Sequence, residues 1–285
     1  MHKKTILNII GYILIFLGLS MGFSALISLY FSGNDLIPIL KSMAYTIFSG
    51  LLIIIFTKKP GKDISVRDGF AVVTLGWIVM AGFSALPFWI SGEIPNYTDS
   101  YFESMSGLTT TGATVLGHPD INEIENLSHG ILFWRSFTQF IGGMGIIVFS
   151  IAMLPMLGMG GVQLFRAEVA GPVADKLTPR VKQTAKYLWS IYLGFVILQS
   201  IILMFEGMTW FDAICHSFTT IATSGFSTKN DSISAFNSPL IEFTIILFMF
   251  LAATNFSLHY QSITHKKLFY FRDTEFKFYL SIILF

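Results

Sequence analysis

The chain has 285 residues, of which 53% are hydrophobic and 12% are charged, and its formal net charge is +1. A soluble domain usually carries about twice that charged fraction, so the composition predicts an integral membrane protein and gives no reason to expect a nucleic-acid partner. The single cysteine, Cys215, excludes an internal disulfide framework and a cysteine-based zinc site.

Six long apolar segments follow one another along the chain. A helix needs about 20 residues to cross a hydrocarbon core of roughly 30 Å, and each of these segments is about that long. They cover residues 5–31, 36–57, 69–92, 127–157, 187–205 and 239–260. A seventh apolar stretch begins near Thr274. The sequence therefore predicts an all-α polytopic membrane protein that contacts the lipid bilayer directly.

Basic residues gather on one side of these segments. If the six spans alternate in direction, most of the 18 Lys and Arg residues share one side with the N-terminus, and the positive-inside rule makes that side the cytoplasm. The opposite side carries Asp35, Glu93, Asp99, Asp120, Glu123, Glu125, Glu206, Asp212 and Asp231. Two interpretations stay open: the outer side merely lacks basic residues, or its acidic residues form a vestibule that concentrates cations.

The connections between the third and fourth spans and between the fifth and sixth share one pattern. Each holds a short semi-apolar stretch, a cluster of Thr, Ser and Gly, and a polar return. Residues 99–114 align with residues 212–227 without a gap, which pairs Gly112 with Gly225. Internal repeats define an architecture, and matching interruptions in two halves of a membrane protein indicate a binding site.

The semi-apolar stretches, residues 98–108 and 209–221, are too short to cross a bilayer, so they are expected to enter the membrane and turn back. Irregular backbone at that depth is tolerated only where it is buried in protein or lines a water-filled cavity. The C-terminal end of each stretch would direct the negative end of a helix dipole into the membrane, which favours a cation. Small residues that serve only helix packing are the alternative, but two clusters in register favour re-entrant segments.

Oxygen atoms in these clusters could replace the hydration shell of K⁺. Thr and Ser supply hydroxyl groups, and Gly allows backbone angles that turn successive carbonyl groups inward. Thr111 and Ser224 stand where potassium-channel filters have valine, so their hydroxyl groups are expected to face away from the ion. The predicted coordinating residues are Thr110, Thr111, Gly112, Ala113, Thr223, Ser224, Gly225 and Phe226.

Several segments resemble TrkH-type potassium uptake subunits of the TrkH/KtrB/HKT superfamily. They are Thr-Thr-Thr-Gly-Ala-Thr-Val at residues 109–115, Gln-Phe-Ile-Gly-Gly-Met-Gly-Ile-Ile at 139–147, Leu-Pro-Met-Leu at 154–157, Gln-Leu-Phe-Arg-Ala-Glu at 163–168 and Thr-Thr-Ile-Ala-Thr-Ser-Gly-Phe-Ser-Thr at 219–228. The resemblance covers essentially the whole chain. Two extra helices before the first repeat are typical of the TrkH branch rather than the KtrB branch.

The resemblance implies helix–re-entrant pore loop–helix repeats like those of a potassium channel, four of them around one pore. By this comparison the chain divides into two N-terminal transmembrane helices (1–60), a first pore repeat (61–160), a cytosolic linker (161–186), a second pore repeat (187–265) and the start of a third (266–285). Only two of four repeats are complete, so the chain is expected to be the N-terminal part of a longer protein.

The resemblance also implies a function and partners. The expected function is potassium uptake through a central pore in the cell inner membrane, with K⁺ as the transported ion, no enzymatic activity and no organic cofactor. A homodimer is expected, together with a TrkA-type cytosolic regulatory subunit that binds nucleotides and docks on the basic segments 160–186 and 261–277. The alternative is a non-conducting fragment or a membrane interaction subunit of the same superfamily.

Three ionisable residues near the repeats allow two interpretations each. Arg135, near the end of the fourth span, could pair with a carboxylate such as Glu103 or extend to the lipid headgroups, and its depth slightly favours the headgroups. Glu103 and His216 take equivalent places in the two repeats, where they could tune the field at the clusters or support the helices. Gly142, Gly143 and Gly145 are predicted to allow close helix packing.

Overall fold

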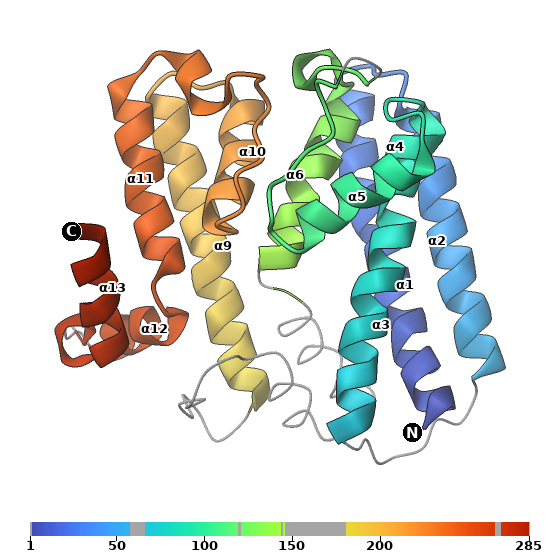
Figure 1. Ribbon diagram of the computed structural model, residues 1–285, viewed down its shortest axis with the longest axis horizontal. Helices are drawn as coiled ribbons and strands as arrows, with labels where there is room; N and C mark the ends of the chain where they lie inside the picture. The colour runs from blue at the N-terminus through green and yellow to red at the C-terminus, as the bar shows by residue number, and fades with distance from the viewer. Residues whose placement is uncertain are drawn as a thin grey trace.

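The computed structural model of the protein describes residues 2–57, 66–118, 121–143, 145, 181–265 and 269–284. Within those ranges every regular element is a helix, as the sequence predicts. Long helices run through the full height of the molecule, whereas two short ones stop near its middle (Figure 1). The end at which the loops after these short helices gather, uppermost in Figure 1, is called the loop end below.

The N-terminal part is a pair of long helices, α1 (Lys3–Tyr30) and α2 (Leu36–Phe56), packed along their lengths. One face of α1 is buried, with Leu14, Leu17 and Met21 all inaccessible to solvent. Most of α2 is exposed and apolar; Phe48, for example, is 61% exposed. A broad exposed face of this composition fits contact with lipid tails.

The first repeat comprises α3 (Val66–Ser84), α4 (Leu86–Ser91), α5 (Tyr97–Leu108) and α6 (His129–Gly143). Helix α5 slants across the bundle from α4 toward α6, and the chain then returns to the loop end (Figure 1). The break between α3 and α4 lies at Ala85, ahead of Pro87, where proline cannot donate a backbone hydrogen bond. The predicted fourth span, residues 127–157, continues beyond Gly143 into residues outside the described ranges.

The second repeat comprises α9 (Val181–Phe205), α10 (Trp210–Ile221), α11 (Pro239–Ala253) and α12 (Phe256–His265), and α13 (Thr274–Leu284) follows it. The predicted span 239–260 is not one helix, because α11 ends at Ala253 and the chain bends by 94° before continuing. Thr254 adopts extended backbone angles at the break. The side chain of His259 contacts the Leu251 carbonyl oxygen at 2.9 Å and so provides a partner for the end of α11.

Four helical stretches of the described residues are long and apolar enough to cross a membrane: Lys3–Tyr30, Leu36–Phe56, Arg67–Ser91 and Lys186–Phe205. The bent pair Pro239–Ala253 and Leu258–Thr264 would make a fifth span if it counts as one. These lengths and the exposed apolar faces support the predicted polytopic membrane architecture.

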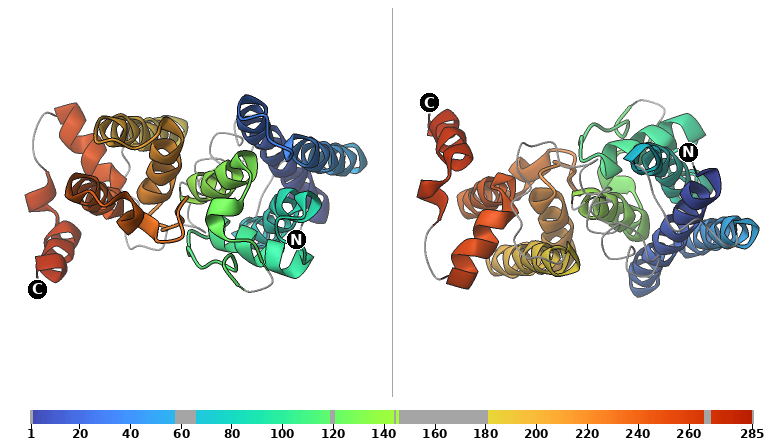
Figure 2. Two further views of the ribbon diagram at one scale, coloured as in Figure 1. Left: turned by 90° about the horizontal axis from the view of Figure 1, so that it is seen from above. Right: turned by 90° about the horizontal axis from the view of Figure 1, so that it is seen from below.

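The two repeats meet where α6 faces α10, which the views from above and below show at the centre of the molecule (Figure 2). Phe218 of α10 packs among aromatic rings of α6, with ring centroids 5.4 Å from Phe137 and 4.7 Å from Phe140. Aromatic pairs at these separations stabilise a contact beyond the area that they bury. Both short helices, α5 and α10, pack against α6 at this boundary.

Candidate functional site

Both predicted re-entrant stretches form helices of 12 residues, α5 and α10. Each begins at a side chain that caps the helix. The Asn96 side-chain oxygen accepts a hydrogen bond from the Thr98 backbone N–H at 3.0 Å, and the Thr209 hydroxyl accepts one from the Asp212 N–H at 3.1 Å. These caps satisfy N–H groups that a helix start leaves without partners. The C-terminus of each helix points toward the middle of the bundle (Figure 1).

The two helices also end in the same way. In α5 the Thr111 N–H donates to the Ser106 carbonyl at 2.9 Å and the Thr110 N–H donates to the Gly107 carbonyl at 3.0 Å. The equivalent residues of α10 make the same pair of bonds, to Thr219 at 3.0 Å and Thr220 at 2.9 Å. This pattern is the Schellman motif, whose turning residue has left-handed backbone angles and is usually glycine.

Here the turning residue is a threonine in both repeats. Thr110 has φ +55° and Thr223 has φ +52°. Left-handed angles are a genuine outlier for a β-branched residue, and they cost on the order of 1–3 kcal/mol, a strain found mostly at functional sites. The same strain at equivalent positions of both repeats marks these turns as candidates for function.

Two residues further on, each loop has a second left-handed position. Gly112 has φ +77° and Gly225 has φ +96°. In an ordinary strand successive residues point to opposite sides. A left-handed residue at every second position lets successive carbonyl groups turn toward one side instead, which is how a loop can present a row of oxygen atoms to a cation.

The structure brings the two clusters together. A Cβ added to Gly112 would fall on the carbonyl oxygen of Ser224, and it would lie 3.1 Å from the Ser224 carbonyl carbon and 3.8 Å from the Gly225 Cα. The backbones of the two loops are therefore in direct contact across the repeat boundary. Their candidate oxygen atoms lie in one place although the loops are far apart in sequence.

Arg135 lies behind the second loop rather than at the lipid headgroups. Its Nε is 2.7 Å from Oε1 of Glu103, and the side chains are 1% and 0% exposed, respectively. Its Nη1 donates to the Ser227 carbonyl at 2.8 Å, and its guanidinium carbon lies 3.7 Å above the ring centroid of Phe226. The headgroup interpretation, slightly favoured from the sequence, is wrong because a carboxylate, a carbonyl and an aromatic face all meet Arg135 inside the protein.

Glu103 and His216 hold the return segments of their own repeats. The Glu103 carboxylate accepts hydrogen bonds from the Thr114 hydroxyl at 2.9 Å and the Val115 N–H at 3.0 Å. The Nε2 atom of His216 lies 3.0 Å from the hydroxyl of Ser227, the residue that aligns with Thr114. Both side chains therefore hold the return segments of the loops, a structural role related to, but not the same as, the support of the helices that the sequence suggested.

Gln139 is a functional candidate that sequence reasoning missed. Its Oε1 accepts hydrogen bonds from the Ser224 hydroxyl at 2.6 Å and from the Phe226 N–H at 3.2 Å, and the residue is fully buried. Gln139 is the first residue of the segment 139–147, for which the sequence analysis considered only the glycines and predicted close helix packing. Those glycines do pack closely: a Cβ on Gly142 would meet the Leu108 carbonyl group, and one on Gly143 would lie 2.7 Å from the Ala222 Cβ.

Asn230 joins the two return loops at the loop end. Its backbone N–H donates to Glu125 at 3.1 Å, its side-chain amide donates to Glu123 at 3.1 Å, and its side-chain oxygen accepts from the Ile124 N–H at 3.0 Å. Among the other predicted outer acidic residues, Asp35 accepts from the Ile131 N–H at 2.9 Å. Structural hydrogen bonding therefore accounts for part of the acidic excess on this side.

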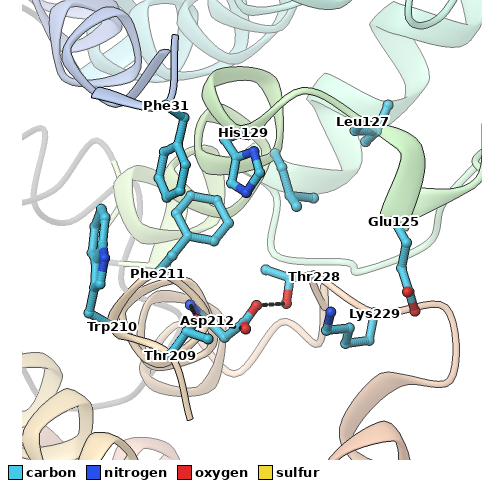
Figure 3. A pocket seen from close by; sticks show the side chains of 11 residues that line it. Phe31, Glu125, Leu127, His129, Thr209, Trp210, Phe211, Asp212, Thr228 and Lys229 are labelled. Carbon is cyan, nitrogen blue, oxygen red and sulfur yellow. Dashed lines mark hydrogen bonds between the residues drawn. The ribbon is translucent and has the colours of Figure 1, made fainter. Parts of the chain in front are cut away.

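A pocket of about 490 Å³ opens beside the second loop, between the ends of α1, α6 and α10 (Figure 3). Aromatic rings line one wall, where Phe31 stacks on His129 with ring centroids 3.9 Å apart. The opposite wall carries Asp212, which accepts a hydrogen bond from Thr228 at 2.6 Å, and Lys229. No ion pair of Lys229 is found among the described residues.

Comparisons with known proteins agree with this arrangement. The TrkH family of cation transport proteins matches residues 37–285. The Trk system potassium uptake protein TrkH of Vibrio parahaemolyticus is 41% identical over 99% of this chain, and that of Escherichia coli K12 is 40% identical over 99%. Each match covers 58% of the relative, so the chain spans somewhat more than half of their length.

A solved structure shows the same fold. The crystal structure of the potassium transporter TrkH from Vibrio parahaemolyticus superposes with a TM-score of 0.83 at 37% identity, covering 99% of this chain and 57% of that one. The family consists of transport proteins rather than enzymes. The family match, the two repeats and the shared fold together establish that this chain belongs to the TrkH family of cation transport proteins.

Proposed function

We propose that this chain contributes to potassium uptake across the cell inner membrane, with its two Thr/Ser/Gly loops as two strands of a selectivity filter. The observation that carries this proposal is the left-handed pair of residues repeated in both loops, Thr110 with Gly112 and Thr223 with Gly225. Relatives that share the fold are named potassium uptake proteins. The ion would meet oxygen atoms of residues 110–113 and 223–226.

Three physical features support a cation at this place. The C-termini of α5 and α10 both point toward the loops, and the negative ends of their dipoles favour positive charge. Backbone carbonyl groups turned to one side can replace the hydration shell of K⁺. The Ser224 hydroxyl is held by Gln139 behind the loop, so the proposal assigns the carbonyl group, not the hydroxyl, of Ser224 to the ion.

The proposal extends to the setting of the pore. The basic sides of the predicted spans support a cytoplasmic N-terminus; the proposal accordingly has the loop end facing outward, with ions entering there. The matched relatives are longer than this chain, and the proposal has the two filter strands line one central pore together with further repeats. A homodimer and a TrkA-type nucleotide-binding regulatory subunit on the cytosolic side complete the proposed assembly. Residues 160–180 of the proposed docking segment 160–186 lie outside the described ranges.

Growth of a potassium-uptake-deficient bacterium at low K⁺ tests the function. One strain would express this 285-residue chain, and another a chimera in which the chain replaces the matching part of the Vibrio parahaemolyticus relative. Rescue by the chimera alone supports two filter strands that need further repeats, and rescue by the chain alone supports self-assembly. If neither rescues growth while both reach the membrane, the chain is a non-conducting member of the family and the proposal fails.

Lys229 is predicted to weaken K⁺ capture by this pathway. Its side chain lines the pocket beside the second loop without an ion pair among the described residues. A positive charge at a cation entrance lowers the local cation concentration, and a field of this kind is screened over about 10 Å at 0.1 M salt.

We expect Lys229→Ala in the chimera to lower the apparent KM for K⁺ about two- to threefold at low ionic strength. Uptake kinetics at low and high concentrations of choline chloride check this. An effect that persists at high salt contradicts an electrostatic cause.

A further inference from the structure

Helix α6 belongs to the first repeat, yet two of its side chains hold the loop of the second. Arg135 and Gln139 are four residues apart, so they lie on one face of the helix, one turn from each other. Between them they contact Ser224, Phe226 and Ser227. These three residues lie on both sides of Gly225, the second left-handed position of that loop.

Each contact satisfies a group that would otherwise be costly to bury. The Phe226 N–H donates to Gln139 at 3.2 Å, and Phe226 is only 2% exposed. The Ser227 carbonyl accepts from Arg135 at 2.8 Å, and the charge of Arg135 is itself balanced by Glu103. A hydrogen bond to a charged group is stronger than one between neutral groups, and a buried group left without a partner is destabilising. The loop is therefore held at both ends of its left-handed turn.

The first loop is held differently in the part of the chain that the structure describes. Its Thr111 hydroxyl lies 2.8 Å from the Thr109 hydroxyl of the same loop. Its return segment bonds to Glu103 of its own helix α5. Around Gly225, the backbone of the second loop is thus bonded to side chains of α6, whereas Asn230 joins the return loops of the two repeats farther along, at the loop end.

We propose that Gln139 and Arg135 are positioning residues that set the discrimination between K⁺ and Na⁺ at the second loop. This inference rests on the proposed function. A filter selects an ion by the size of its cavity or by the number and field of its carbonyl groups. A loop tied to a rigid helix by buried hydrogen bonds resists contraction around the smaller Na⁺. Because that helix belongs to the neighbouring repeat, the same bonds also fix the distance between the two loops.

The test measures Rb⁺ uptake, as a substitute for K⁺, and Na⁺ uptake by the chimera described above. Gln139→Leu keeps the side-chain size but removes the oxygen that accepts both hydrogen bonds. We expect its Rb⁺/Na⁺ uptake ratio to fall about tenfold, since losing buried hydrogen bonds of this kind costs about enough for that factor. The ratio should fall through increased Na⁺ uptake, while the amount of protein in the membrane stays normal.

Gln199 offers a matched control. It is also a fully buried glutamine in a long helix, α9, and its amide has no hydrogen-bond partner within the described residues. Gln199→Leu makes the same chemical change at a residue whose amide makes no hydrogen bond to either loop within the described residues, so the uptake ratio should stay at the wild-type value. An equal fall in both variants would overturn the proposal, because the loss would then not depend on contact with the loop.

Ser224→Ala tests the same contact from the other side. It removes the hydroxyl, which lies 2.6 Å from the Gln139 Oε1 atom and 2.9 Å from the Thr219 carbonyl oxygen, and it leaves the side chains of α6 unchanged. We expect a smaller fall in the ratio, about threefold, and no further loss in the double variant beyond that of Gln139→Leu alone. If Gln139→Leu does not reach the membrane, Ser224→Ala decides the question, and a wild-type ratio in that variant contradicts the proposal.

Failure of this inference is distinguishable from failure of the proposed function. If the unmodified chimera shows no Rb⁺ uptake, the filter proposal itself is wrong and the positioning role falls with it. If the unmodified chimera prefers Rb⁺ and the Gln139 and Ser224 variants prefer it equally, the filter stands. In that case only the role of α6 in discrimination is refuted.

Discussion

Potassium uptake is expected to be lost when Gly112 is replaced by alanine in the chimera, with the protein still present in the membrane. Gly112 has φ +77°, and a Cβ there would fall on the Ser224 carbonyl oxygen. Left-handed angles cost a residue with a Cβ about 1–2 kcal/mol. The clash adds to that cost and cannot be relieved by a rotamer change, because its partner is backbone. The added methyl group therefore displaces an oxygen proposed to coordinate the ion. Rb⁺ uptake and membrane protein levels, measured together, check this result.

Two other glycines separate the causes of that loss. Gly225 has φ +96°, but a Cβ added there would meet no atom within 4 Å. The Gly225→Ala variant should therefore also lose uptake, and strain in the loop would be the only cause. Gly117 has φ +83°, open space around it and a place in the return segment, beyond the proposed coordinating residues 110–113. Gly117→Ala carries the same backbone strain and should keep uptake near the wild-type rate. Wild-type uptake by Gly112→Ala would show that the contact between the loops does not form the ion path.

Glu103→Gln is expected to destabilise the protein by about 3–5 kcal/mol, the usual cost of removing one member of a buried ion pair. The side chains of Arg135 and Glu103 are almost inaccessible to solvent. The variant therefore leaves the buried positive charge of Arg135 without a carboxylate to balance it. The new amide can still accept from Thr114 or Val115, so the loss reports mainly the charge. Thermal unfolding in detergent, followed by fluorescence and size-exclusion chromatography, measures the effect.

The matching controls are a second carboxylate and a double variant. Glu125 is exposed and bonds to Asn230, so Glu125→Gln should change stability by no more than about 0.5 kcal/mol. Adding Arg135→Gln to Glu103→Gln removes the uncompensated charge and should recover part of the lost stability. If the double variant loses more unfolding free energy than the two single variants lose together, the charge of Arg135 is not balanced by Glu103 alone.

The sequence alone was sufficient for the architecture of the repeats. The alignment of residues 99–114 with residues 212–227 predicted two short helices, and α5 and α10 begin and end within one residue of the predicted stretches. This success has a physical reason, because length and hydropathy decide whether a segment crosses a membrane or turns back. The choice of coordinating residues remains a prediction, because length and hydropathy do not decide which oxygen atoms face an ion.

Contacts between helices could be predicted only in part from sequence patterns. Arg135 stands near the end of an apolar segment, where headgroup contact is common; the sequence offered Glu103 as the alternative partner, and only the tertiary structure decides in favour of Glu103. In the sequence, Gln139 is a single polar residue in a glycine-rich segment, and nothing there indicates that it contacts Ser224 of the second loop. The break after Ala253 was missed because an average over hydropathy does not respond to one extended residue such as Thr254.

The way in which α6 holds the second loop has a consequence for biosynthesis. The chain leaves the ribosome from its N-terminus, and N-terminal units generally fold first. Helix α6 is therefore made before residues 224–227 exist, and those residues emerge next to a template that already carries Arg135 and Gln139. A delay in membrane insertion of the first repeat would leave the second loop without its partners at the moment it forms.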